Sequence, residues 1–204
     1  MNTVPMRSEK ASRYGVTAIV LHWSIAVGVL VLIGMGLVMD HVSLDPMRMF
    51  QLYQLHKSIG ITVLLLVCFR VGWRLTHAAP PLPADMKTGE RRAAHLAHLA
   101  LYGLQVLLPL SGWAMVSASV LGIPTVLFDT VPWPDLPVLA TLQDKAPVEA
   151  ALKGFHHWAA WSFAALIVLH VAAVLRHAMI LRDSVPGRML PWLAGPSYHE
   201  HLKD

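Results

Sequence analysis

The amino-acid sequence predicts an all-α integral membrane protein, a four-helix bundle with both termini in the cytoplasm. Of the 204 residues, 55% are hydrophobic and only 14% are charged, whereas roughly a quarter of the residues in a soluble domain are charged. Four apolar stretches are long enough to cross a bilayer, which takes about 20 residues. Most Lys and Arg residues flank these stretches on one side, which determines the predicted orientation.

The four predicted spans lie within a transmembrane domain of residues 15–191. We expect helices at about 15–39, 53–75, 93–117 and 154–178. The first has no Asp, Glu, Lys or Arg up to Met39. The second carries Lys57 and Arg70 close enough to its ends for their charged groups to reach the headgroups. Pro109 interrupts the third and is expected to kink it.

The segments outside the spans are predicted from composition. Residues 122–153 contain several prolines, so we expect an interfacial loop or short surface helix there. Residues 1–14 and 192–204 are expected to be a cytoplasmic N-terminus and a cytoplasmic tail. The basic start and first apolar run also suit a cleaved signal peptide, but no small-x-small site follows, which favours a retained helix.

The orientation follows from the distribution of Lys and Arg. Twelve of the sixteen fall in the N-terminal segment, the second connection and the C-terminal segment. These twelve are Arg7, Lys10, Arg13, Arg70, Arg74, Lys87, Arg91, Arg92, Arg176, Arg182, Arg188 and Lys203. The other four are Arg48, Lys57, Lys145 and Lys153. Because cytoplasmic loops carry the excess of positive charge, both termini are predicted to be cytoplasmic.

Two functional classes are excluded by composition. Cys68 is the single cysteine, which rules out an intrachain disulfide, a Cys-rich zinc site, an iron–sulfur cluster and a C-x-x-C-H haem attachment. We interpret it as a small buried apolar residue. No block of Lys and Arg alternates with aromatic residues, so no nucleic-acid surface is predicted.

Four histidines fall at two depths in the predicted spans. His156 and His170 are 14 residues apart, which places them within roughly 40° of one helix face and about 21 Å apart along the axis. His157 turns to a nearly opposite face. The predicted orientation puts His56 at the outer level with His156, and His22 at the inner level with His170. Two imidazoles that face each other at one depth are what a six-coordinate b-type haem requires.

Other residues near these levels are weaker candidates. Arg70 and Arg74 share a helix face, and Lys57 adjoins His56, so all three are candidate partners for haem propionates. For the arginines, the positive-inside rule is an equally good explanation. His177 returns to the face of His170 and is a candidate contact for a quinone headgroup or a propionate. His95 and His98 are interpreted as part of an interfacial face. Gly28, Gly34, Gly36 and Gly60 would leave room for a haem edge.

The chain resembles the bacterial cytochrome b561 family, four-helix diheme b-type cytochromes of the inner membrane. The matching segments are "RYGVTAIVLHWSIA" at 13–26, "QLHKSIGITVLLLVCFRVGWRL" at 54–75, "AHLAHLALYGLQVLLPLSGW" at 94–113 and "GFHHWAAWSFAALIVLHVAAVLRHAMILRDSVPGRMLP" at 154–191. The resemblance implies two haem b groups with His22, His56, His156 and His170 as axial ligands. It also implies a bacterial inner-membrane location and electron exchange with the ubiquinone pool. Some relatives are superoxide oxidases that pass the electron from superoxide to ubiquinone.

Close relatives often carry two adjacent histidines near the end of the fourth helix, whereas here His177 stands alone, which weakens the case for a quinone role of that patch.

The leading hypothesis is single-electron transfer across the membrane, with superoxide:ubiquinone oxidoreductase activity as its enzymatic form. The alternative is a membrane anchor and electron conduit for a partner dehydrogenase or hydrogenase. A transporter that uses membrane histidines is a third hypothesis, disfavoured because the spans contain no acid.

Overall fold

Four long helices form the protein, seen here as a computed structural model that describes residues 14–78, 80, 86–183 and 185–190. They are α1 (Val16–His41), α2 (Pro46–Thr76), α3 (Thr88–Ser117) and α5 (Ala146–Arg176), the last continued by a π-helical turn at His177–Leu181. All four are long and apolar enough to cross a membrane. The predicted four-helix membrane bundle is therefore confirmed. Cytoplasmic segments were predicted at 1–14 and 192–204, and all of these residues except Tyr14 lie outside the described residues.

Three helices begin earlier than the hydropathy pattern indicated, and α3 is one of them, since it starts at Thr88 rather than at about 93. α2 starts at Pro46 rather than at about 53, and α5 starts at Ala146 rather than at 154. Asp45 caps α2 by accepting a hydrogen bond from the backbone N–H of Arg48 at 3.1 Å, and a proline stands in the first turn of α2 and of α5. Capping residues and first-turn prolines are local signals for a helix start. The helices therefore extend by polar turns beyond the apolar stretches from which the spans were predicted.

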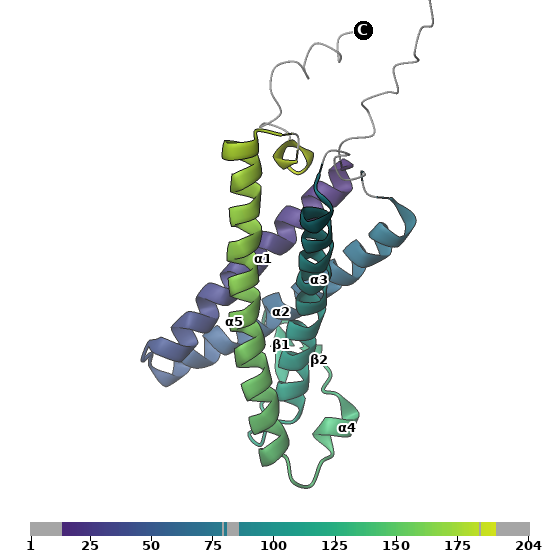
Figure 1. The fold of residues 1–204 in the computed structure, drawn as a ribbon. Helices are drawn as coiled ribbons and strands as arrows, with labels where there is room; N and C mark the ends of the chain where they lie inside the picture. The colour runs from purple at the N-terminus through teal and green to yellow at the C-terminus, as the bar shows by residue number, and fades with distance from the viewer. Residues whose placement is uncertain (1–13, 79, 81–85, 184, 191–204) are drawn as a thin grey trace, which may run out of the picture.

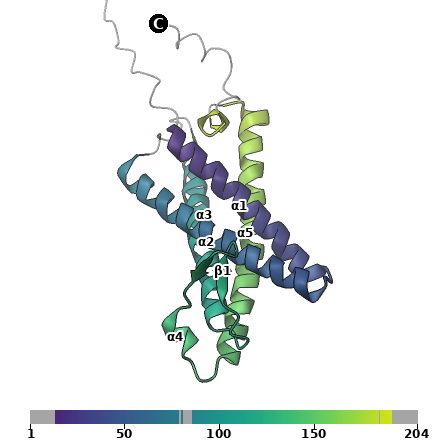
Figure 2. The ribbon, with the colours of Figure 1, turned by 180° about the vertical axis from the view of Figure 1, so that it is seen from behind.

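The helices form two pairs. α1 packs along α2, α3 packs along α5, and α2 also contacts α3. The α1/α2 pair is inclined across the α3/α5 pair, as Figures 1 and 2 show from opposite sides. Ile25, Val29, Val67 and Phe163 belong to the buried core where the pairs meet. A cavity is left between the pairs beside that core, and Val29 and Phe163 line it, so the candidate site adjoins the core.

A short hairpin covers one end of the bundle. β1 (Thr125–Leu127) pairs antiparallel with β2 (Val131–Trp133), and Thr125 lies opposite Trp133. A four-residue helix, α4 (Pro137–Ala140), follows. The expected loop therefore contains a hairpin. Its strands are too short to show alternation of apolar and polar residues in the sequence, and one of them contains a proline. We call this the hairpin end of the bundle, and the opposite end, where α1 begins and α5 finishes, the terminal end.

Candidate functional site

A cavity of about 360 Å³ opens between the two helix pairs at the hairpin end. Helices α1, α2, α3 and α5 and both strands contribute to its wall, which is mainly apolar. His56 on α2 and His156 on α5 both line it. The sequence placed these two histidines at one level, and the structure brings them to one cavity.

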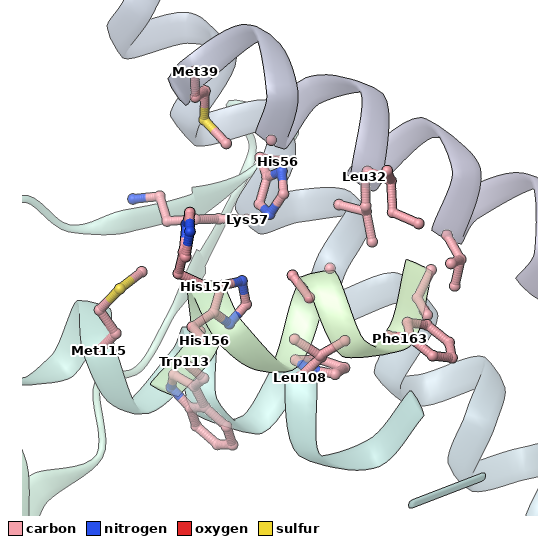
Figure 3. A pocket seen from close by; sticks show the side chains of 18 of the residues that line it. Leu32, Met39, His56, Lys57, Leu108, Trp113, Met115, His156, His157 and Phe163 are labelled. Atoms are coloured by element: carbon pink, nitrogen blue, oxygen red, sulfur yellow. The ribbon is translucent and has the colours of Figure 1, made fainter. Parts of the chain in front are cut away.

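The two rings face each other across this space (Figure 3). Their centroids are 6.5 Å apart and their planes are inclined by 71°. Two metal–imidazole bonds of about 2 Å each, together with about 1 Å from each nitrogen to its ring centre, span about 6 Å. The separation of His56 and His156 therefore suits one iron ion held between them.

The chemical state of His156 also suits a metal ligand. The Ser111 hydroxyl donates a hydrogen bond to the carbonyl of Leu108 at 2.7 Å, and its oxygen lies 2.8 Å from Nδ1 of His156. Because the Ser111 proton is already committed, the oxygen accepts the Nδ1–H of the imidazole. Nε2 then carries the lone pair that binds metal. Nδ1 of His56 is buried, and no partner for it is found among the described residues.

Glycines shape the wall around these rings. Gly36 and Gly60 line the cavity, and a Cβ atom added at either would meet nothing within 4 Å. At Gly112, in contrast, an added Cβ would lie 3.3 Å from Cε1 of His156. Gly28 instead lets α1 approach α2, since its Cβ would come within 2.7 Å of the Val63 side chain. Of the four glycines expected beside a haem edge, Gly36 and Gly60 line the cavity, while Gly28 serves helix packing.

A second group of imidazoles lies toward the terminal end. His22 on α1 and His170 on α5 are close enough to interact electrostatically, and both also interact with Arg70 on α2. His98 on α3 joins this group, with its ring centroid 6.0 Å from that of His170. Nδ1 of His22 is buried and has no hydrogen-bond partner in the part of the chain that the structure describes. The predicted level of His22 and His170 thus includes a third histidine.

The weaker candidates occupy distinct places. Lys57 lines the cavity beside His56, and its ammonium lies 3.5 Å from the carbonyl of Pro124. Arg70 lies over the ring of Tyr102, whereas Arg74 is exposed. His177 donates from Nδ1 to the Asp183 carboxylate at 2.6 Å, at the terminal end.

His157 also borders the cavity but is exposed, and its ring lies against the neighbouring Trp158. Cys68 is exposed on α2 rather than buried as expected, because its helix face turns away from the other helices.

Three residues near these levels were not anticipated. Gln105 and Trp133 line the cavity, and each has a buried polar atom without a hydrogen-bond partner among the residues described. His98 was expected at an interface but lies beside His170. Only Gln105 carries a usable sequence signal, since an uncharged amide in the middle of an apolar span needs a partner. The positions of Trp133 and His98 depend on the loop fold and on the rotation of α3.

The residues present fit a b-type haem. The facing imidazoles and the glycine-bordered apolar cavity are the features that such a cofactor needs. Fold and site together define a membrane cytochrome.

Comparison with known proteins identifies which kind of membrane cytochrome this is. Residues 13–192 match the family model described as prokaryotic cytochrome b561. The chain is 36% identical over 179 residues to cytochrome b561 homolog 2 of Escherichia coli (strain K12), covering 87% of this chain and 91% of that protein. It is also 29% identical over 140 residues to the probable superoxide oxidase CybB of Yersinia pestis, covering 67% of this chain and 73% of that protein.

The chain belongs to the prokaryotic cytochrome b561 family, as its motifs predicted. Membership implies binding of b-type haem and a role in electron transport in a bacterial inner membrane. The four apolar helices agree with that location.

Proposed function

We propose that this protein is a diheme b-type cytochrome that carries single electrons across the inner membrane and exchanges them with the ubiquinone pool. The observation that carries the proposal is the 6.5 Å separation of the His56 and His156 rings across an apolar cavity. His56 and His156 hold one haem at the hairpin end. His22 and His170 hold the second at the terminal end, where both lie within electrostatic range of Arg70.

The predicted orientation makes the terminal end cytoplasmic and the hairpin end outer. Haem held by His56 and His156, and by His22 and His170, would supply one-electron redox chemistry when bound. Apolar walls such as Val29 and Phe163 lower the local dielectric and exclude water from the cavity. Ser111 holds His156 in the tautomer whose Nε2 faces the cavity.

Cations near each level are the proposed partners of the haem propionates. Lys57 serves the hairpin end and Arg70 the terminal end, because each lies among the ligands of its level. Arg74 is a further partner at the cytoplasmic surface. His177, oriented by Asp183, is the proposed contact for a quinone headgroup or a propionate at the terminal end.

In the enzymatic form of the proposal, the protein is a superoxide:ubiquinone oxidoreductase. The similarity to the probable superoxide oxidase of Yersinia pestis supports this form. Two superoxide anions would each give up one electron and become dioxygen, and ubiquinone would take two electrons and two protons to become ubiquinol. Lys57 and Lys153 line the cavity, and Lys145 belongs to the same outer face, so all three would attract the anion. The names of the two relatives do not favour the anchor alternative.

The test is a dithionite-reduced minus oxidised spectrum of the purified protein with pyridine haemochrome quantitation of haem per chain. Two haems per chain are expected. Substituting His22, His56, His156 or His170 with Ala should remove one haem in each case, and His157→Ala should retain both. Protein from haem-sufficient cells that contains no haem would refute the proposal, and loss of haem in His157→Ala would refute the ligand assignment.

A further inference from the structure

The indole of Trp133 is the polar group at the hairpin end whose position calls for an explanation. Trp133 closes strand β2 and lines the cavity that holds His56 and His156. Its Nε1 atom is buried, and no acceptor for its proton is found among the described residues. A buried N–H normally has a hydrogen-bond partner, because leaving it without one forfeits its interaction with water. The missing acceptor is therefore expected inside the cavity.

The protein fixes the hairpin firmly before Trp133. Gln54 of α2 donates from Nε2 to the carbonyl of Pro124 at 3.0 Å. The Ser58 hydroxyl oxygen accepts the backbone N–H of Phe128 at 2.9 Å, and Ser58 is 1% exposed. Strand β1 is therefore attached to the same helix that carries His56.

The segment after Trp133 is fixed to α3. Trp113 donates from Nε1 to the carbonyl of Pro134 at 2.8 Å, and the Ser117 hydroxyl oxygen accepts the N–H of Leu136 at 2.9 Å. The ring of Trp113 also packs edge-on against Trp133, with centroids 5.6 Å apart. The indole of Trp133 is thus held between anchors on two helices, and its orientation is set by the fold.

The charged side chains that line this cavity are Lys57, Lys153 and Asp40. Two cations and one anion favour a negatively charged group near them. Trp133 adds a neutral donor that comes from strand β2 of the hairpin rather than from a helix. A carboxylate is attracted by a cation and also accepts a hydrogen bond from a neutral N–H group. Haem carries two propionate carboxylates.

We propose that Trp133 is a positioning residue for the hairpin-end haem, and that its indole N–H donates a hydrogen bond to a propionate carboxylate. This inference rests on the proposed function, since it requires a haem between His56 and His156. It assigns a role to the β1–β2 hairpin as the structure that orients that haem from the outer face. Because a hydrogen bond draws negative charge away from the iron, its loss should stabilise the ferric state and lower the midpoint potential.

The experiment compares the haem-loaded Trp133→Phe variant with Trp161→Phe. Phenylalanine keeps an aromatic ring but removes the N–H. Trp161 lines the same cavity but is 47% exposed, which makes it the matched control. In redox titration, one haem of Trp133→Phe should show a several-fold higher ratio of oxidised to reduced haem at a given potential. A tenfold change in this ratio corresponds to about 59 mV in midpoint potential. The affected haem should be the one that remains in His22→Ala.

An infrared readout tests the hydrogen bond itself. Redox-difference spectra of protein whose haem carries isotope-labelled propionates should show a carboxylate band that moves in Trp133→Phe and stays in place in Trp161→Phe. If Trp133→Phe does not fold, an experimental structure of the unsubstituted haem-loaded protein decides. An Nε1-to-propionate oxygen distance within about 3.2 Å would support the inference, and one beyond about 4 Å would overturn it.

The outcomes separate this inference from the function on which it rests. If the unsubstituted protein binds no haem at the His56/His156 level, the proposed function fails. If it binds haem there and both tryptophan variants have the potentials and carboxylate bands of the unsubstituted protein, the role of Trp133 is refuted and the cytochrome proposal stands.

Discussion

The hydroxyl oxygen of Ser111 accepts the Nδ1–H of His156 at 2.8 Å and thereby fixes the orientation and the tautomer of that imidazole. The two residues lie on different helices, α3 and α5, so the contact also joins the helices beside the cavity. The same hydroxyl donates to the carbonyl of Leu108 at 2.7 Å, which leaves it no second proton to offer His156. A ligand held in this way presents Nε2 to a metal without further rearrangement.

Ser111→Ala is expected to weaken haem binding at the His56/His156 level by roughly 10- to 100-fold, the usual cost of removing the hydrogen-bond partner of a metal-binding histidine. Haem content per chain after titration with a competing haem-binding protein measures the effect. Ser162→Ala is the control, because the Ser162 hydroxyl also donates to a backbone carbonyl, that of Trp158 at 2.9 Å, and has no hydrogen bond to an imidazole among the described residues. Equal haem retention in the two variants would contradict the role given to Ser111.

Gly112→Ala should disturb the same ligand by a steric route. The added methyl group would lie 3.3 Å from Cε1 of His156, so the ring must move by a few tenths of an ångström. A free side chain tolerates such a shift, but a ligand fixed to a metal does not. We expect altered axial-ligand signals in electron paramagnetic resonance spectra and lower haem occupancy. Gly103→Ala on the same helix, with nothing within 4 Å of the new Cβ, should behave like the unsubstituted protein.

The assignment of the terminal-end ligands can be tested against the third histidine. The ring of His98 lies 6.0 Å from that of His170, a separation close to that of the outer pair. If His22 and His170 are the ligands, His98→Phe should retain two haems per chain while His22→Ala retains one. The reverse pattern in haemochrome quantitation would show that α3, rather than α1, supplies the ligand at this level.

Arg70→Gln should lower the midpoint potential of the terminal-end haem. Arg70 interacts electrostatically with His22, His98 and His170, and a nearby cation disfavours the ferric state, which carries more positive charge. Arg74→Gln should have a smaller effect, because Arg74 is exposed and its charge is screened by solvent. Redox titration of both variants shows which substitution shifts the midpoint potential more. A larger shift in Arg74→Gln would contradict it.

The sequence predicted the span count and which histidines share a level, because both depend on length and on helical periodicity along one chain. The separation of 14 residues between His156 and His170 fixes their common face regardless of the neighbouring helices. The position of His98 depends on how α3 is rotated against α5, which its own periodicity does not specify. Trp133 depends on a hairpin whose order comes from contacts with Gln54 and Ser58 on another helix. Contacts between distant segments were the part that sequence reasoning could not supply.

Helix packing gives the last prediction, at the contact between α1 and α2. An alanine at Gly28 would bring its Cβ within 2.7 Å of Cγ2 of Val63, and Val63 is only 3% exposed. Valine has little freedom to change its side-chain rotamer in a helix, so α1 and α2 must move apart. Overpacking of this kind costs about 1–3 kcal/mol. Thermal unfolding in detergent should therefore show a lower Tm for Gly28→Ala.

Gly34→Ala is the matched control on the same helix, because its added Cβ would meet nothing within 4 Å. It should unfold at or slightly above the Tm of the unsubstituted protein, since alanine restricts the unfolded chain more than glycine does. A decrease for both variants would mean that any side chain in this part of α1 is harmful. A decrease for Gly28→Ala alone would establish that the close approach of α1 to α2 at Val63 is what requires glycine.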